Sequence, residues 1–257
     1  MRRLKQKPKR TALFAWVTMW WHGKLLLLST LFGRISQTIT NKICLIFSAN
    51  CCIIAVRGAN IMILTSAMLL DRYKNYANPY GKIQRLVQAK KLIPLTKGLY
   101  EDDPHASGLY LSNAIYGPSY ISFNTALAYY GLIPEAVYDF TSATTEKRKN
   151  KSFTNYFGTF TYRDIPLDAY PYGIVSKTEN GYTYLIATPE KALCDKLYAL
   201  PPVSNQKQLE ELLFDSMRID RVEFAKLNRC DIYFVAPKYH STNLKLLTAY
   251  LRRKNHE

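Results

Sequence analysis

Hydrophobic and polar residues follow both helical and strand periods along this chain. Ile83, Leu86 and Val87 recur at the spacing of one helix face, whereas residues 157–162 alternate between apolar and polar with the period of a strand. Further segments of each kind follow toward the C-terminus, with Gly, Pro and Asn clusters between them. The pattern predicts an α+β fold in which a few antiparallel strands lie between helices.

Residues 62–103 predict a small helical module that ends in a hairpin. Thr65 is a good N-cap for a helix through residue 73, and Asn78-Pro79 is a typical start for a second helix over residues 80–91. Residues 92–100 then predict a tight hairpin with Gly98 at the turn. Helix, turn, helix and hairpin in this order are typical of a winged helix-turn-helix domain.

Residues 104–257 predict a larger domain of antiparallel strands and helices. Ser122 is a candidate N-cap for the second of two early helices, Asn180-Gly181 is a strong hairpin signal, and Thr188-Pro189 and Asp220 are typical helix starts. The helices are expected over 107–116, 123–130, 189–200, 206–217, 221–227 and 242–253, and the strands over 137–141, 157–162, 170–175 and 182–187.

The charge distribution sets the first 61 residues apart from the rest. The chain of 257 residues has a formal net charge of +16, which favours an anionic partner, and residues 1–61 contain ten Lys or Arg but no Asp or Glu. A membrane anchor and a signal peptide are two interpretations, but the longest uncharged run, Ile43 to Val56, is too short to span a bilayer. We favour a third, in which residues 1–61 are a hydrophobic leader outside the globular protein and Met62 is the start.

The basic module has the chemistry of a duplex DNA reader. A helix with Gln and Arg on its exposed face can hydrogen-bond base edges in the major groove, and nearby lysines can hold phosphates. We expect Gly81, Gln84, Arg85 and Gln88 to face the bases. Lys82, Lys90, Lys91 and Lys97 are expected on the phosphate backbone. The alternative is a solvated basic helix that packs on the rest of the protein.

No motif for catalysis, metal binding or cofactor binding stands out. The sequence contains no Gly-rich phosphate loop, HExxH or GxSxG motif, and its five Cys and four His form no zinc pattern. Lys191 and Asp195 are spaced as an ordinary ion pair on a helix face, worth a few tenths of a kcal/mol. We therefore expect a reduced, cytoplasmic protein that is not an enzyme and holds neither metal nor cofactor.

Three segments resemble the AbiEi-type antitoxins of bacterial type IV toxin–antitoxin systems. Residues 85–100 are similar to that family's second helix and wing ending in Gly-Leu-Tyr, residues 118–134 to the opening of its second domain, and residues 187–198 to its capped motif helix. The resemblance covers most of the chain after residue 62 and implies a winged helix-turn-helix followed by an antitoxin domain over 104–257. A short N-terminal helical part departs from the family pattern.

The resemblance implies a repressor that binds inverted repeats in its own promoter. It also implies that the C-terminal domain counteracts a nucleotidyltransferase toxin without a stable complex, and that Thr188, Glu190, Lys191 and Asp195 belong to the antitoxin motif, in a structural or a functional role. A solitary regulator without a toxin is the first alternative. A membrane-tethered regulator and a nucleic-acid enzyme using Glu190 and Asp195 are less favoured.

Overall fold

The computed structural model describes residues 63–253. The expected leader over residues 1–61 and the expected start at Met62 lie outside this range. Within it, no helix is long and apolar enough to cross a membrane.

Residues 63–101 form two helices and a three-stranded antiparallel sheet, which we call the N-terminal module. Its elements are β1 (Ile63–Thr65), α2 (Ser66–Arg72), α3 (Pro79–Gln88), β2 (Ile93–Thr96) and β3 (Leu99–Glu101), and β3 is the central strand. Both expected caps are confirmed: Thr65 Oγ1 accepts the amide of Met68 at 3.2 Å, and Asn78 Oδ1 accepts the amide of Gly81 at 2.8 Å. A small core of Leu64, Leu69, Ile83 and Leu92 holds the helices on the sheet.

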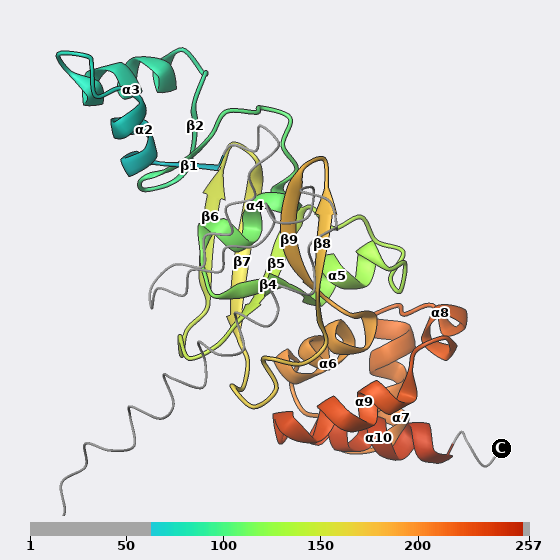
Figure 1. Ribbon diagram of the computed structural model, residues 1–257. Coiled ribbons are helices and arrows are strands. Elements are labelled where there is room, and N and C mark those ends of the chain that lie inside the picture. Colours follow the sequence, from blue (N-terminus) through green and yellow to red (C-terminus); the bar gives the residue numbers. More distant parts are fainter. Residues whose placement is uncertain (1–62, 254–257) are drawn as a thin grey trace, which may run out of the picture. The chain divides into compact units, whose positions relative to one another are not determined.

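The remaining residues form a six-stranded sheet and a group of helices, which we call the body (Figure 1). The strands are β4 (Ser119–Ile121), β5 (Asp139–Thr144), β6 (Lys151–Asn155), β7 (Gly158–Asp164), β8 (Ile174–Glu179) and β9 (Tyr182–Ala187), in the order β6-β7-β5-β4-β9-β8. The helical elements are α4 (Gly108–Ile115), α5 (Phe123–Tyr129), α6 (Pro189–Ala199), α7 (Gln206–Glu211), η1 (Leu212–Ser216), α8 (Arg221–Ala225), α9 (Arg229–Val235), η2 (Ala236–Tyr239) and α10 (Thr242–Arg253). The fold is therefore α+β with mixed sheet pairing.

The antiparallel expectation for this sheet was wrong at two pairings. Strand β5 runs parallel to β7, and β4 runs parallel to β9. The reason is the path of the chain: after β5 it crosses to the edge strand β6, and β7 returns by a hairpin between the two. β7 consequently has the direction of β5, which a local hydrophobic pattern does not reveal.

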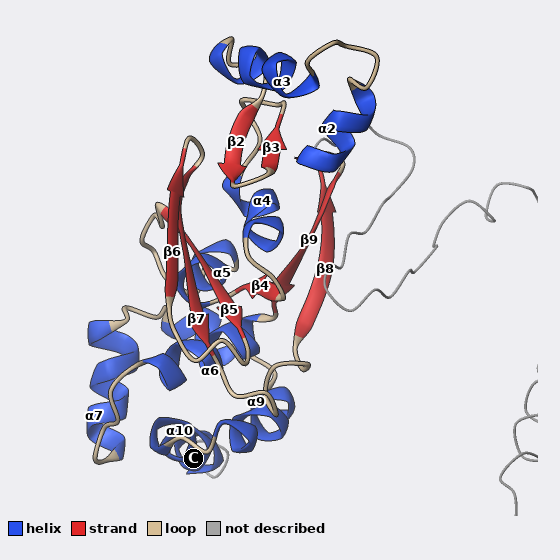
Figure 2. Cartoon of the chain, turned by 90° about the vertical axis from the view of Figure 1, so that its left-hand side faces the viewer, coloured by secondary structure: helices blue, strands red, loops and turns tan. Residues whose placement is uncertain are grey.

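Helices cover both faces of the six-stranded sheet (Figure 2). On one face, Ser112 of α4 hydrogen-bonds Ser142 of β5 at 2.7 Å, and Leu111 packs with Phe160 of β7. On the other face, Thr125 of α5 hydrogen-bonds Thr141 of β5 at 2.9 Å. Successive strand residues point to opposite faces, so these contacts place α4 and α5 on opposite sides. The main core lies on the α5 side, where the helices α6 to α10 also gather.

Several short elements were not predicted. Strands β1, β4 and β6 and helix α9 were missed, and residues 170–173 form turns rather than the start of a strand. Ser122 does occupy the N-cap position of α5, but its side chain makes no capping hydrogen bond. Its hydroxyl instead donates to Asp195 at 2.6 Å, so tertiary packing has redirected a residue of high capping propensity.

Two polar contacts and a shared apolar cluster join the N-terminal module to the body. The side-chain amide of Asn155 donates to Leu95 O at 3.1 Å, and the hydroxyl of Tyr182 donates to Glu101 Oε1 at 3.1 Å. Leu95 also packs in the same cluster as Phe160 of β7. The β2–β3 hairpin is thus fastened to the body, while α3 lies on the far side of the module (Figures 1 and 2).

Candidate functional site

The outer face of α3 carries the residues expected to read bases. Ile83 is buried in the module core, whereas Gln84, Arg85 and Gln88 are exposed. The positions 84, 85 and 88 share one side of the helix, because Gln88 is four residues from Gln84 and three from Arg85, and residues three and four apart are neighbours on a helix surface. The structure therefore brings together three long polar side chains with a rigid backbone beneath them.

Gly81, near the start of this helix, has a local structural role that is independent of DNA binding. A Cβ on Gly81 would lie 2.9 Å from the side-chain nitrogen of Asn78, closer than real Cβ contacts allow. The same Asn78 side chain caps the helix, so Gly81 makes room for the cap. Neighbouring Lys82 is half-buried, with its ammonium 5.2 Å from the ring centre of Tyr76.

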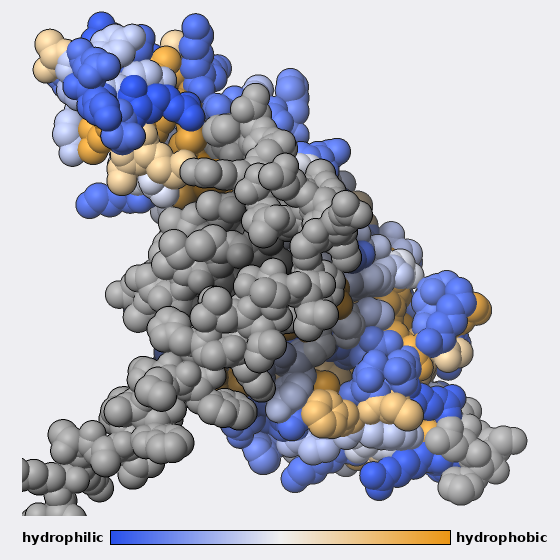
Figure 3. All heavy atoms as spheres, in the orientation of Figure 1, coloured by the Kyte–Doolittle hydropathy of each residue, from blue (hydrophilic) through white to orange (hydrophobic). Residues whose placement is uncertain are grey.

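The three other expected phosphate ligands, Lys90, Lys91 and Lys97, are all exposed. Lys90 ends α3 in the left-handed conformation, with a φ of 54°. The amides of Lys90 and Lys91 bond back to Val87 O and Leu86 O, at 3.0 and 2.9 Å, which is the Schellman pattern normally completed by Gly. Lys97 lies in the β2–β3 turn. Hydrophilic residues cover much of the visible surface of this module in Figure 3.

Two aromatic residues beside this face were missed by the sequence reasoning. Tyr80, the second residue of α3, is 65% exposed, and Tyr76 in the preceding turn is 50% exposed. No periodic signal marked Tyr80: position 80 falls on the same side of α3 as Ile83 and Val87, so periodicity alone would have placed its ring in the core. The N-terminal residues of a recognition helix are those that reach base edges, which makes Tyr80 a further candidate contact.

The motif residues Thr188 and Glu190 have structural roles. Thr188 Oγ1 accepts the amide of Lys191 at 3.3 Å, which confirms Thr188 as the cap of α6. Glu190 is nearly buried, and its carboxylate accepts the amide of Asn228 at 2.9 Å. A carboxylate in the first helical turn also interacts favourably with the helix dipole. Glu190 therefore holds the loop before α9 against the start of α6.

Lys191 and Asp195 form the ion pair expected from their spacing, but the pair is fully buried, so the expectation of an ordinary pair on a helix face was wrong in its environment. The side chains of both residues have zero exposure, and their charged atoms lie 3.4 Å apart. The hydroxyls of Tyr120, Ser122 and Tyr239 donate to Asp195. The ammonium of Lys191 donates to Ala169 O at 2.7 Å and to the hydroxyl of Tyr239. We call these six residues the buried cluster.

The electrostatics of the buried cluster are those of a structural centre. Burial lowers the pKa of Lys191, an effect that the charge of Asp195 opposes. Burial and the adjacent carboxylate raise the pKa values of Tyr120 and Tyr239 well above normal, which keeps both hydroxyls protonated as donors. The charged atoms of Asp195 and Lys191 all have hydrogen-bond or ion-pair partners within the protein. The cluster ties β4, the start of α5, the loop at residue 169, α6 and η2 together.

The described residues contain no cluster of three or more His, Cys, Asp or Glu that could hold a metal ion. Cys194 is fully buried in α6, as expected of a core residue, and burial raises the pKa of its thiol. The residues brought together are thus of two kinds: an exposed polar and basic face on the N-terminal module, and a buried ion pair in the body. In the comparisons with known proteins, no family model matches the chain and no curated protein matches it as a relative.

Proposed function

We propose that the N-terminal module is a winged helix-turn-helix that binds double-stranded DNA. In this proposal α3 is the recognition helix and the β2–β3 turn is the wing. The observation that carries it is the exposed row Gln84, Arg85 and Gln88, flanked by exposed Lys90, Lys91 and Lys97. From residue 72 to residue 97 the sequence contains no Asp or Glu, so nothing acidic opposes a phosphate backbone over this stretch.

The chemistry divides these side chains into two groups. Arg85 can pair with guanine, and Gln84 and Gln88 can pair with adenine, in the major groove. The lysines contact phosphates, which position the protein without reading sequence. The buried core residue Ile83 and the cap at Asn78 hold α3 rigidly, so little order has to be gained on binding.

We further propose that the chain is an antitoxin of a type IV toxin–antitoxin system, which represses its own operon and counteracts a nucleotidyltransferase toxin. The support is the resemblance of residues 85–100, 118–134 and 187–198 to the AbiEi family. A nucleotidyltransferase reading frame directly downstream of the gene is the expected genomic context. Survival of cells that express this frame together with the chain, and not without it, is the matching growth assay.

DNA binding is tested by fluorescence anisotropy on the upstream promoter and on a shuffled duplex of equal length. Arg85→Ala is expected to cost about 1–3 kcal/mol and to relax preference at one base position, whereas Lys97→Ala weakens binding to every sequence alike. With the four proposed lysine contacts to phosphates, affinity falls on the order of a hundredfold between 50 and 200 mM salt. The matched control is Lys245→Ala, an exposed lysine of α10 in the body.

One result would overturn the DNA proposal: equal affinity for promoter and shuffled duplexes that is unaffected by Arg85→Ala. If the promoter is bound specifically but the downstream frame is absent or harmless, the antitoxin role fails and a solitary regulator remains.

A further inference from the structure

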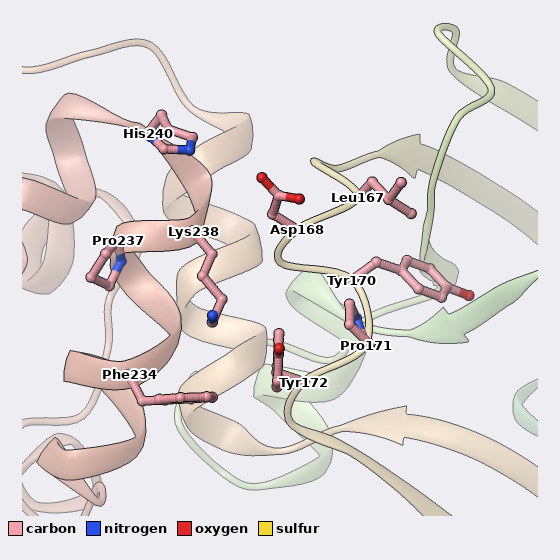
Figure 4. Close-up of a pocket in the computed structure, with 9 residues that line it drawn as sticks. All are labelled: Leu167, Asp168, Tyr170, Pro171, Tyr172, Phe234, Pro237, Lys238 and His240. Atoms are coloured by element: carbon pink, nitrogen blue, oxygen red, sulfur yellow. The ribbon is translucent and has the colours of Figure 1, made fainter.

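An open cleft lies in the body, remote in the chain from α3. One wall is the connection between β7 and β8, and the other is the end of α9 with η2. The cleft has a volume of about 590 Å³, within the usual range of small-molecule sites. Figure 4 shows its side chains, among them Asp168, Tyr172, Phe234, Lys238 and His240.

The central feature of the cleft is the ammonium of Lys238. It lies 4.4 Å from the ring centre of Tyr172 and 4.7 Å from that of Phe234, beside two rings that pack edge to face with their centres 5.1 Å apart (Figure 4). In the part of the chain that the structure describes, no hydrogen bond or ion pair joins this ammonium to a protein acceptor. Two aromatic faces orient the cation but leave its N–H donors for another acceptor. An anionic group of a ligand would be that acceptor.

The surroundings of Lys238 add the other parts of a ligand. Phe234 is 57% exposed and Leu167 is 54% exposed, unusual for large apolar residues that share one cleft. The imidazole of His240 is exposed and lies at the end of the same wall as Lys238 (Figure 4). The carboxylate of Asp168 belongs to the opposite wall. The cleft thus offers an aromatic surface with a cation beside it and, farther along its walls, an imidazole and a carboxylate.

We infer that this cleft binds a nucleoside phosphate. Lys238 contacts the phosphate, since an ammonium without an acceptor among the described residues is a suitable donor to it. The base lies on the exposed ring of Phe234, because every nucleobase has a face that stacks on aromatic side chains. Asp168 accepts a hydrogen bond from a ribose hydroxyl, as an acidic residue does in dinucleotide sites.

The buried cluster explains why this cleft keeps its form. Lys191 donates to Ala169 O in one wall and to the hydroxyl of Tyr239 in the other. The ring of Tyr170, which lines the cleft, packs on Tyr120 with ring centres 5.2 Å apart. Both walls are therefore anchored to the Lys191–Asp195 pair from below. Such preorganisation reduces the entropy lost when a ligand binds.

The nucleoside phosphate could be a free nucleotide or the phosphorylated end of a strand. The test uses the full chain and titrates AMP, adenosine, inorganic phosphate and a 5′-phosphorylated dinucleotide, followed by calorimetry or ligand-observed NMR. We expect AMP or the phosphorylated dinucleotide to bind at least tenfold more tightly than adenosine and than inorganic phosphate. Binding of AMP assigns the site to free nucleotides, and binding of the dinucleotide alone assigns it to strand ends.

Variants of exposed residues then locate the site. Lys238→Met keeps an apolar stem beside the two rings and is expected to weaken nucleotide binding at least tenfold, and Phe234→Ala by a similar factor. The controls are Lys245→Met and Tyr138→Ala, because Tyr138 is 86% exposed and does not line the cleft. Promoter binding by Lys238→Met should equal that of the unmodified chain, which separates this inference from the DNA proposal. Failure of both nucleotide probes to bind, or unchanged affinity in Lys238→Met, would overturn it.

Discussion

At the scale of single residues, two lysine–carboxylate pairs show how environment decides what an ion pair is worth. Lys226 and Glu223 lie 2.6 Å apart but are exposed, whereas Lys191 and Asp195 lie 3.4 Å apart and are fully buried. Exposed pairs contribute little because water screens them, while a buried charge that loses its partner keeps the full desolvation cost. Disruption of the Lys191–Asp195 pair should therefore cost more stability than disruption of the Lys226–Glu223 pair, although its charged atoms lie farther apart.

The first prediction concerns removal of one charge from the buried pair. Lys191→Met and Asp195→Asn are each expected to lower the free energy of unfolding by about 3–5 kcal/mol. The double variant should cost clearly less than the sum, since neither charge is then stranded. Urea unfolding of the four proteins measures this. Lys226→Met, the exposed control, should change stability by less than about 1 kcal/mol, and a similar loss in both lysine variants would contradict the argument.

Sequence spacing predicted that Lys191 and Asp195 pair, but it could not predict their burial. The partners of Asp195 come from positions 75, 73 and 44 residues away, namely Tyr120, Ser122 and Tyr239. Only the tertiary fold brings them together. The exposed face of α3 was more accessible to prediction, because the periodicity of a short helix is a local property.

At the scale of elements, capping chemistry was the most dependable signal. Thr65, Asn78, Thr188 and Asp220 all cap the helices predicted for them. Strands of three residues such as β4 offer too little alternation to detect, and β6 begins at Lys151, the last residue of a mostly charged run over residues 146–151. The parallel pairings depend on the path of the chain between strands, which no local pattern contains.

The Schellman cap of α3 leads to the second prediction. Lys90 holds a positive φ, which disfavours residues with a side chain by about 1 kcal/mol, so Lys90→Gly should raise the free energy of unfolding by up to about 1 kcal/mol. The same change removes one proposed phosphate contact. It should therefore reduce the slope of log binding constant against log salt concentration by about one. Chemical denaturation and anisotropy titrations measure the two effects.

The neighbouring lysine gives the control for this prediction. Lys91 is also exposed but does not have a positive φ, so Lys91→Gly should weaken DNA binding without the gain in stability. A gain in both variants would show that the cap geometry is not its cause.

At the scale of the whole described chain, Glu101 connects the two sheets. It belongs to β3 and is fully buried, and its Oε1 accepts the hydroxyl of Tyr182 from β9 and the amides of Asp102 and Asp103. Its second oxygen is buried without a partner among the described residues. Burial raises the pKa of Glu101 to about 7, although its hydrogen bonds act in the opposite direction. The nearby charge of Asp102 also disfavours ionisation of Glu101 and so raises its pKa.

The sign of the resulting pH dependence follows from proton binding. The unfolded chain releases the proton of Glu101 near its ordinary value of 4.5, while the folded protein keeps it to about 7. Between these values the folded state binds more protons, so the stability from Glu101 is complete below pH 4.5 and is lost as the pH rises to about 7. The loss amounts to at most about 3.5 kcal/mol, since each pKa unit corresponds to about 1.4 kcal/mol.

Glu101→Gln removes this titration and provides the third prediction. The variant pays a constant cost for burying an amide, so the informative quantity is its stability relative to the unmodified chain at each pH. We expect the free energy of unfolding of Glu101→Gln to rise steadily relative to that of the unmodified chain between pH 5 and pH 7, and the difference to stay constant above that range. Urea unfolding followed by circular dichroism measures both free energies. Glu211→Gln, at an exposed position of α7, should keep a constant difference throughout. A constant difference for Glu101→Gln as well would contradict the prediction. It would mean that the contact between Glu101 and Tyr182 does not depend on pH in this range.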